Sequence, residues 1–223
     1  RMTYRQVVEK HGYAIPTKRV AGMIRRLRKL GPDSGSWRYH MTGYNKRGEF
    51  SQMALLPEKW KKLLDAPFEV SDKCCDELKK KPFYDYNRRT GRKPITGEMV
   101  GDSLHRQVQW LQRGCNVFDA NRPVSRPMSF WTEHDVWSYI RSRGLAYCTI
   151  YDQGYDRTGC VWCMFGVHLE QGENRCQKLA RTHPKLYDHC VNSLGLGEVL
   201  DFLGITYEPS RVLRLPFTKR SGT

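Results

Sequence analysis

The sequence predicts an α/β protein, and three observations carry this prediction. In several segments the apolar residues recur every three or four positions, the spacing that places them on one face of a helix. One short segment is followed by a glycine turn and then by a further helix, the order of a strand, turn and helix unit. A chain of 223 residues is also long enough to bury a core, ordinarily as one domain with at most a small appendage.

The first helix that we predict in detail runs from Thr17 to Leu30, with Thr17 as its N-cap. The face opposite its apolar residues is basic, and two interpretations are open: a solvated face, or a track that binds anions or nucleic acid. The stretch Gly31 to Glu49 contains four glycines and few aliphatic residues, which predicts a loop or flexible insertion. A short helix is expected over Pro57 to Leu64.

The next elements surround two adjacent cysteines. Ser71 is a suitable N-cap for a helix that carries Cys74 and Cys75 in its first turn and ends near Gly91. Lys93 to Met99 is predicted to be a short strand, and the turn after it exposes amides that can bind an anion. Further helices are expected over 102–113, 132–143 and, in two or three pieces broken at Pro184 and Gly195, over the remainder of the chain.

Charge and cysteine content narrow the class of protein. Lysine and arginine number 38 against 23 aspartate and glutamate, and the net charge of +15 favours anionic partners such as nucleotides, sulfate esters or nucleic acid. Eight cysteines with an adjacent pair and a CxxC motif do not resemble the disulfide framework of a small secreted domain, so a reducing cytoplasm is expected. No apolar run approaches 18 residues and no signal peptide is recognisable, which predicts a soluble protein.

Four of the cysteines form two close-spaced pairs. Cys74 and Cys75 are adjacent, and Cys160 and Cys163 form the CxxC motif, so the fold is expected to close one metal or iron–sulfur centre. Adjacent thiolates on a helix project about 100° apart, which suits a wide [4Fe–4S] cluster better than a single tetrahedral zinc ion, although zinc stays the alternative. The remaining cysteines have no close-spaced partner and are expected only to pack: Cys115, Cys148, Cys176 and Cys190.

Polar residues downstream of the paired cysteines form a second candidate group. Lys79 opens a run of three lysines that cannot share one helical face, so at least one is expected to point toward the cysteine centre. Gly97 allows a ligand to approach the backbone, and Ser103 and Arg106 have the spacing to bind one phosphate or sulfate together. The structural alternative is that Ser103 caps the helix and Arg106 pairs with Asp102.

Taken together, these motifs resemble the phosphoadenosine and adenosine phosphosulfate reductase family of the adenine nucleotide α-hydrolase (PP-loop) superfamily. The resemblance runs from about Thr3 to Tyr207. It is carried by the paired cysteines with Lys79 and Pro82, by Ile95-Thr96-Gly97 with Ser103 and Arg106, by SFWTEHDVWSYI at 129–140 and by YDRTGCVWCMFGVH at 155–168. It implies a Rossmann-like parallel sheet, N-terminally incomplete in this sequence, together with a helical iron–sulfur region.

The resemblance also implies domains and residue roles. Residues 1–145 would form the C-terminal portion of the nucleotide α-hydrolase-like domain, with a flexible insertion at about 31–56, and residues 146–223 a CxxC loop and helical region packed on it. A [4Fe–4S] cluster would be held by Cys74, Cys75, Cys160 and Cys163. An adenine nucleotide, which is phosphoadenosine phosphosulfate (PAPS), adenosine phosphosulfate (APS) or ATP, would be bound by Lys79, Gly97, Ser103 and Arg106. A thiol reductant or a sulfur-donor protein would be a further partner.

Three departures from the family pattern raise alternatives. The family's phosphate-binding Ser-Gly-Gly-Lys-Asp-Ser loop is not in this sequence, and the segment from Leu213 onward offers no cysteine as a nucleophile. Leu78 and Met99 stand where the reductases place arginines. One alternative is therefore an ATP-dependent sulfur-transfer component of DNA or RNA modification, in line with the positive charge, and the other is a degenerate nucleotide-binding subunit. No catalytic residue is predicted.

Overall fold

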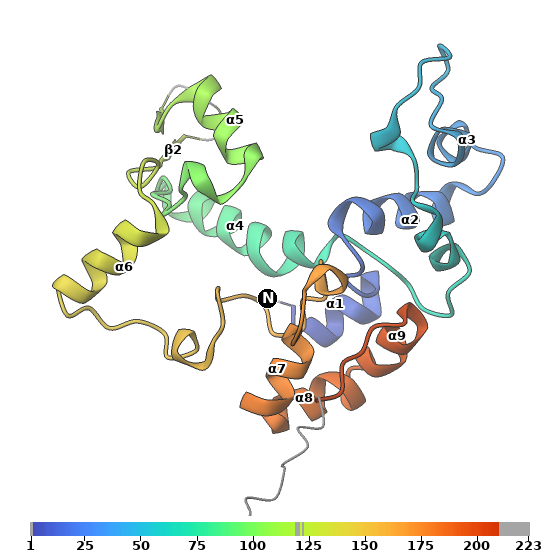
Figure 1. The fold of residues 1–223 in the computed structure, drawn as a ribbon. Coiled ribbons are helices and arrows are strands. Elements are labelled where there is room, and N and C mark those ends of the chain that lie inside the picture. Colours follow the sequence, from blue (N-terminus) through green and yellow to red (C-terminus); the bar gives the residue numbers. More distant parts are fainter. Residues whose placement is uncertain (1, 119–120, 122, 210–223) are drawn as a thin grey trace, which may run out of the picture. The chain divides into compact units, whose positions relative to one another are not determined.

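The computed structural model describes residues 2–118, 121 and 123–209, and the tail from Leu213 lies outside them (Figure 1). Contacts between residues divide the chain into two compact units: unit 1 comprises 1–78 and 159–223, and unit 2 comprises 79–158. The domain ranges that we expected from the sequence, 1–145 and 146–223, stay a prediction. Within the described ranges we find no helix with the length and apolar character needed to cross a bilayer.

Unit 1 holds the buried core and is built from short helices. Its elements are α1 (Tyr4–His11), α2 (Lys18–Leu30), α3 (Gly35–Thr42), η1 (Gln52–Ala54), η2 (Glu58–Leu64), η6 (Val167–Leu169), α7 (Arg175–Thr182), α8 (Pro184–Asp188), η7 (His189–Ser193) and α9 (Leu196–Leu203). Fully buried side chains come from both ends of the sequence, including Ile24 and Leu27 of α2 and Leu196 and Leu200 of α9. The helices expected at Thr17 and after Pro184 and Gly195 are confirmed as α2, α8 and α9. The side chain of Thr17 caps α2 by accepting from the amide of Val20.

Three arginines on the basic face of α2 serve neither of the roles that we had considered for that face. Arg28 donates to the carbonyl oxygens of Leu63, Ala66 and Phe68 at 2.7–2.8 Å. Arg19 donates to the carbonyl of Met53, and Arg25 pairs with Asp72 at 2.9 Å. The segment that follows α3 is largely irregular, so its carbonyls need donors from elsewhere. Arg19 and Arg28 supply them, while Arg25 binds a carboxylate.

The segment expected to be a loop contains a helix. Ser34 caps α3 by accepting from the amide of Trp37 at 3.1 Å, and Gly43 ends the helix with a φ of +80°. His40 of α3 is buried, and its Nδ1 donates to the carbonyl of Ala54 at 2.7 Å. The loop prediction is therefore wrong over α3, because a polar helix of eight residues offers little apolar periodicity to recognise.

Unit 2 combines helices with a very small sheet. Its elements are α4 (Lys81–Thr90), η4 (Val100–Asp102), α5 (Leu104–Arg113), β1 (Asn116–Val117), β2 (Val124–Ser125), α6 (Glu133–Ser142) and η5 (Tyr151–Gln153), and η3 (Asp76–Lys80) leads into it from unit 1. In the described residues β1 and β2 pair antiparallel, and Ile95 forms one parallel bridge with Ser125. The strand predicted over Lys93 to Met99 is thus reduced to that bridge, since a strand without a partner is not stable alone.

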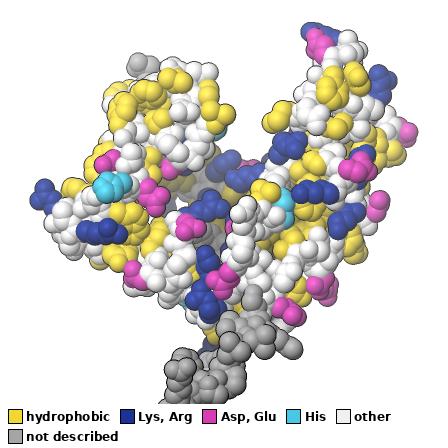
Figure 2. All heavy atoms as spheres, viewed as in Figure 1, with side chains coloured by type: hydrophobic (Ala, Val, Ile, Leu, Met, Phe, Trp, Pro, Cys, Tyr) yellow, Lys and Arg dark blue, Asp and Glu magenta, His cyan; other side chains and the backbone are white. Residues whose placement is uncertain are grey.

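The side chains of unit 2 are mostly accessible. Among its described residues only Ser129 is buried, while Leu104, Leu111 and Phe130 are each at least 70% exposed. Figure 2 shows hydrophobic side chains gathered over the region that Figure 1 labels α5. The helix predicted at 132–143 is confirmed as α6, where Thr132 and Asp135 form the expected capping box.

Candidate functional site

The CxxC motif forms a tight turn in unit 1. The amide of Cys163 donates to the carbonyl of Cys160 at 3.0 Å. Two further bonds hold the turn from outside: Nη1 of Arg175 donates to the carbonyl of Cys163 at 2.8 Å, and the amide of Gly166 donates to the carbonyl of Pro16 at 2.8 Å. The turn is therefore attached both to the N-terminus of α7 and to the segment that precedes α2.

Arg175 is itself fixed by Glu170. The backbone amide of Arg175 donates to Oε2 of Glu170 at 2.7 Å, its Nε donates to Oε1 at 2.6 Å, and its Nη2 contacts the same carboxylate. A guanidinium held by several charge-assisted bonds keeps one orientation. Sequence reasoning missed this pair because residues five apart have no helical relationship, and the only signal was the proximity of both residues to the CxxC motif.

The paired cysteines lie where the sequence predicted them. Helical structure begins at Cys74, passes through the π-helical η3 and continues as α4 to Thr90, where Gly91 ends it with a φ of +69°. Pro82 accounts for the π-helical turn, because its ring would clash with the carbonyl four residues earlier in a regular α-helix. The predicted N-cap at Ser71 is wrong by two residues, since the first helical amides donate to the carbonyl of Lys73. The Ser71 hydroxyl accepts from the amide of Lys73 at 3.1 Å and closes the turn that precedes the helix.

Three of the four predicted cysteines share one electrostatic environment. The pKa of the Cys74 thiol is raised by a hydrogen bond with Cys75, by burial and by negative charge on Cys75 and Cys163. The pKa of Tyr4 is raised by burial and then by the same charge on Cys74 and Cys163. The Tyr4 hydroxyl donates to the carbonyl of Trp162 at 3.3 Å, and the two rings stack with centroids 5.2 Å apart. The helix of Cys74 and the CxxC turn therefore meet beside Tyr4.

This arrangement suits a thiolate-bound group, although the ligand set is not closed. Among the described residues, no three or more cysteine, histidine or acidic side chains are grouped closely enough to hold a metal ion. All eight cysteines belong to the described part of the chain, and none of them forms a disulfide. Thiolates that are partly buried beside one another repel, and a positively charged group between them relieves that repulsion. Cys160 is three residues from Cys163 in the same turn, and thiolates are the donors that soft metal centres prefer.

The predicted nucleotide-binding residues all lie in unit 2. Lys79 is its first residue and is exposed on η3. Ser103 caps α5 by accepting from the amide of Arg106 at 3.4 Å, and Arg106 pairs with Asp102 and, at 3.9 Å, with Glu98. The structural alternative that the sequence left open is therefore realised. At Gly97, an added Cβ atom would meet only the Met128 sulfur at 3.4 Å, which is ordinary contact.

A hollow of about 510 Å³ adjoins these residues in unit 2. One wall is η4 with Met99 before it, and the other is the segment from Ser129 to Glu133, which contains Phe130 and Trp131. The amide of Val100 donates to the carbonyl of Ser129 at 2.9 Å and ties the two walls together. The hollow combines the aromatic side chains of Phe130 and Trp131 with the acidic side chains of Asp102 and Glu133, so its lining suits a planar ring better than an anionic group.

Comparison with known proteins identifies the family. The family model of the phosphoadenosine phosphosulfate reductase domain matches residues 45–165. The chain belongs to the phosphoadenosine phosphosulfate reductase family. The matched range contains both cysteine pairs and all four predicted nucleotide-binding residues. Membership implies an adenine nucleotide α-hydrolase-like α/β fold, and the described residues are the mostly helical part of it with a two-stranded sheet.

Several relatives share parts of this chain. An adenosine 5'-phosphosulfate reductase of Salinibacter ruber is 32% identical over 110 residues, which cover 47% of this chain and 40% of the relative. The corresponding reductase of Staphylococcus epidermidis is 49% identical over 37 residues, 17% of this chain and 15% of the relative. An uncharacterized protein of Methanocaldococcus jannaschii is 26% identical over 141 residues, 60% of this chain and 28% of the relative. The chain thus spans less than half the length of these relatives, and no solved structure matches it.

Proposed function

We propose that this chain is part of an iron–sulfur phosphosulfate reductase-like enzyme that binds an adenine nucleotide and handles sulfur. The observation that carries the proposal is the family match, because residues 45–165 contain every residue to which we assign a role. This chain covers less than half the length of these relatives, so the activity that we propose is that of the whole protein and not of this chain alone.

The cysteines would hold a [4Fe–4S] cluster, with zinc as the alternative. The ligands are Cys74 and Cys75 from the first turn of a helix and Cys160 and Cys163 from the CxxC turn. Amides at the start of a helix favour thiolates, and Arg175 fixes the backbone of the turn through the Cys163 carbonyl. When bound, the group would act electrostatically and as an organiser of the site, roles that need no redox cycling.

The nucleotide would be PAPS, APS or ATP, bound through residues of unit 2. Lys79 would contact the anionic end, and the absence of a side chain at Gly97 would let the nucleotide approach the backbone. Ser103 and Arg106 would bind phosphate or sulfate. Arg106 already has a carboxylate partner in Asp102, so nucleotide binding requires it to exchange that partner for the ligand.

Two measurements test this function on the full-length protein. Anaerobic absorption with iron and sulfide analysis tests the cluster, and a colourless protein loaded with zinc would overturn it. Release of sulfite from PAPS or APS with a dithiol donor tests the reaction. If cluster-replete, full-length protein releases none, the reductase assignment fails.

One feature favours a second candidate function, an ATP-dependent sulfur-transfer component of DNA or RNA modification. On α4 the exposed aromatic residues Phe83, Tyr84 and Tyr86 precede Arg88 and Arg89, and the whole chain carries a charge of +15. Bases stack on exposed rings while arginines neutralise phosphates. This function predicts salt-sensitive binding of a single-stranded oligonucleotide, and no binding at low ionic strength would exclude it. Failure of both tests would leave a degenerate nucleotide-binding subunit.

A further inference from the structure

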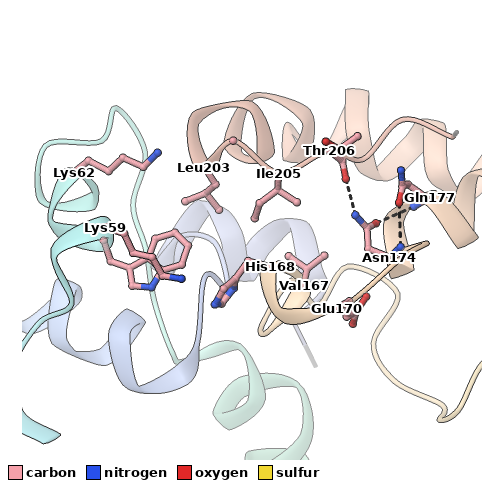
Figure 3. A pocket seen from close by; sticks show the side chains of 13 residues that line it. Lys59, Lys62, Val167, His168, Glu170, Asn174, Gln177, Leu203, Ile205 and Thr206 are labelled. Carbon is pink, nitrogen blue, oxygen red and sulfur yellow. Dashed lines mark hydrogen bonds between the residues drawn. The ribbon is translucent and has the colours of Figure 1, made fainter.

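Unit 1 contains a cavity that neither the cysteines nor the predicted nucleotide site explains. Its volume is about 580 Å³, within the usual range for small-molecule sites. Figure 3 shows side chains from η2, from η6, from the start of α7 and from the segment after α9 around it. All of its lining lies in the described part of unit 1, and no cysteine belongs to that lining.

The walls of the cavity are fixed by hydrogen bonds before any ligand arrives. Nδ2 of Asn174 donates to the carbonyl of Thr206 at 2.6 Å, and Nε2 of Gln177 donates to the carbonyl of Glu208 at 3.0 Å. These bonds attach the segment after α9 to the N-terminus of α7. On the other side, Nζ of Lys62 donates to the carbonyl of Phe202 at 2.7 Å and attaches η2 to the end of α9. A site that is already formed loses little conformational entropy on binding.

Lys59 and His168 face the cavity with donor groups that have no carboxylate partner among the described residues. Among the described residues, Lys59 has no carboxylate partner, and its Nζ lies 4.8 Å from the centroid of the Trp60 ring. His168 packs edge-on against the same ring at 4.8 Å, and its Nδ1 is shielded from solvent with no hydrogen-bond partner. The carboxylate of Glu170, which also lines the cavity, is occupied by Arg175. The charge of Lys59 is therefore not balanced by a carboxylate of the lining.

The rest of the lining near these two residues is apolar. Val167 and Leu203 are buried, Ile205 is half-buried, and Figure 3 shows all three between Lys59 and the segment at Thr206. We propose that the cavity binds a small organic anion, in which an oxyanion head group lies between Lys59 and His168 and an apolar body lies against Val167, Leu203 and Ile205. The head group is a carboxylate or a phosphate monoester, which share the charge and acceptor geometry that these donors require.

The proposal is tested by binding of four probes to the full chain. Phenyl phosphate and benzoate carry both the ring and a charged head, inorganic phosphate carries the charge alone, and phenol carries the ring alone. The readout is the ring nitrogen signals of His168 in ¹H–¹⁵N NMR spectra. Saturable shifts with one or both charged aromatic probes, and weaker or no shifts with phosphate and phenol, are expected. Benzoate and phenyl phosphate distinguish the two head groups, and no saturable shift with either would overturn the proposal.

A matched pair of variants locates the binding. Lys59→Gln should weaken the better probe roughly tenfold, the loss expected for a charge-assisted hydrogen bond. Lys61→Gln removes the same charge from the same element, but Lys61 pairs with Glu58 at 2.7 Å, so binding should be unchanged. Equal affinities in the two variants would refute the site. Neither the cluster nor the nucleotide enters this experiment, so its outcome is independent of the proposed function. If AMP displaces the probe and Lys59→Gln binds it with unchanged affinity, the probe binds at another site.

Discussion

Arg175→Ala is the perturbation that the structure makes most specific for the cysteine centre. It removes the donor to the Cys163 carbonyl and the ion pair with Glu170, and the Arg175 side chain is only 21% exposed. A hydrogen bond to a charged group contributes about 1.5–3 kcal/mol, whereas a pair this close to the surface adds at most about 1 kcal/mol. We therefore expect the free energy of unfolding to fall by about 2 kcal/mol, which also makes the open form of the CxxC turn roughly 30-fold more populated.

The matched control lies on the same helix. Arg181 pairs with Glu173 at 3.1 Å, but its side chain is 56% exposed and its bonds to Glu173 leave the CxxC turn untouched. Arg181→Ala should therefore change the free energy of unfolding by no more than about 0.5 kcal/mol. Urea unfolding gives the stability of both variants, and the rate of Cys163 alkylation in metal-free protein reports opening of the turn. The rate of iron loss to a chelator reports the cluster separately.

Equal unfolding free energies and equal alkylation rates in the two variants would refute the role of Arg175. If the turn opens as expected but wild-type protein contains no iron, the positioning of Cys163 stands and the cluster assignment fails.

Three further predictions concern single residues of unit 1. Arg28→Ala should lower the free energy of unfolding in urea by about 3 kcal/mol, because three backbone carbonyls lose their donor, whereas Lys29→Ala should cost less than about 0.5 kcal/mol. Burial, and then Lys59, lowers the pKa of His168 in the folded protein, so the unfolded chain takes up a proton first as the pH falls. The contribution of neutral His168 to the free energy of unfolding is therefore complete above about pH 6.5 and is lost as the pH falls through the folded pKa. His168→Gln should remove this contribution to the pH dependence of thermal unfolding. Cys74→Ser should abolish bound iron in elemental analysis, while Cys115→Ser should retain it.

Each of these predictions has a contradicting result. A wild-type-like Arg28→Ala variant would show that water replaces the lost donor. An unchanged pH profile in His168→Gln would assign the acid sensitivity to other groups. Iron retained by Cys74→Ser at the wild-type ratio would remove Cys74 from the ligand set.

The features that the sequence predicted correctly are local ones. Thr17 and Thr132 cap α2 and α6 as expected, and Gly91 ends the helix that begins at Cys74. A cap is a hydrogen bond within three or four residues, so the information for it lies in the same few positions. The family could be recognised for a related reason, because the short motifs and their order are read directly from the sequence and do not depend on how the chain folds.

The strand over Lys93 to Met99 and the expected loop that became α3 show the limit of local information. A strand exists only with a partner, and the described residues give Ile95 a single bridge to Ser125. Helix α3 is stabilised by contacts outside itself, such as the bond from buried His40 to Ala54.

By itself, then, the sequence determined the helix ends, the two cysteine pairs and the family to which they belong. Only the tertiary structure decided where the long charged side chains go. Arg28 turns to three carbonyls of a segment distant in the sequence, and Arg175 turns to the CxxC turn. Of the two roles that the sequence left open for Arg106, the structure shows the pair with Asp102. A guanidinium reaches several ångströms from its own backbone and binds whichever acceptors the folded chain brings there, and sequence spacing does not encode that choice.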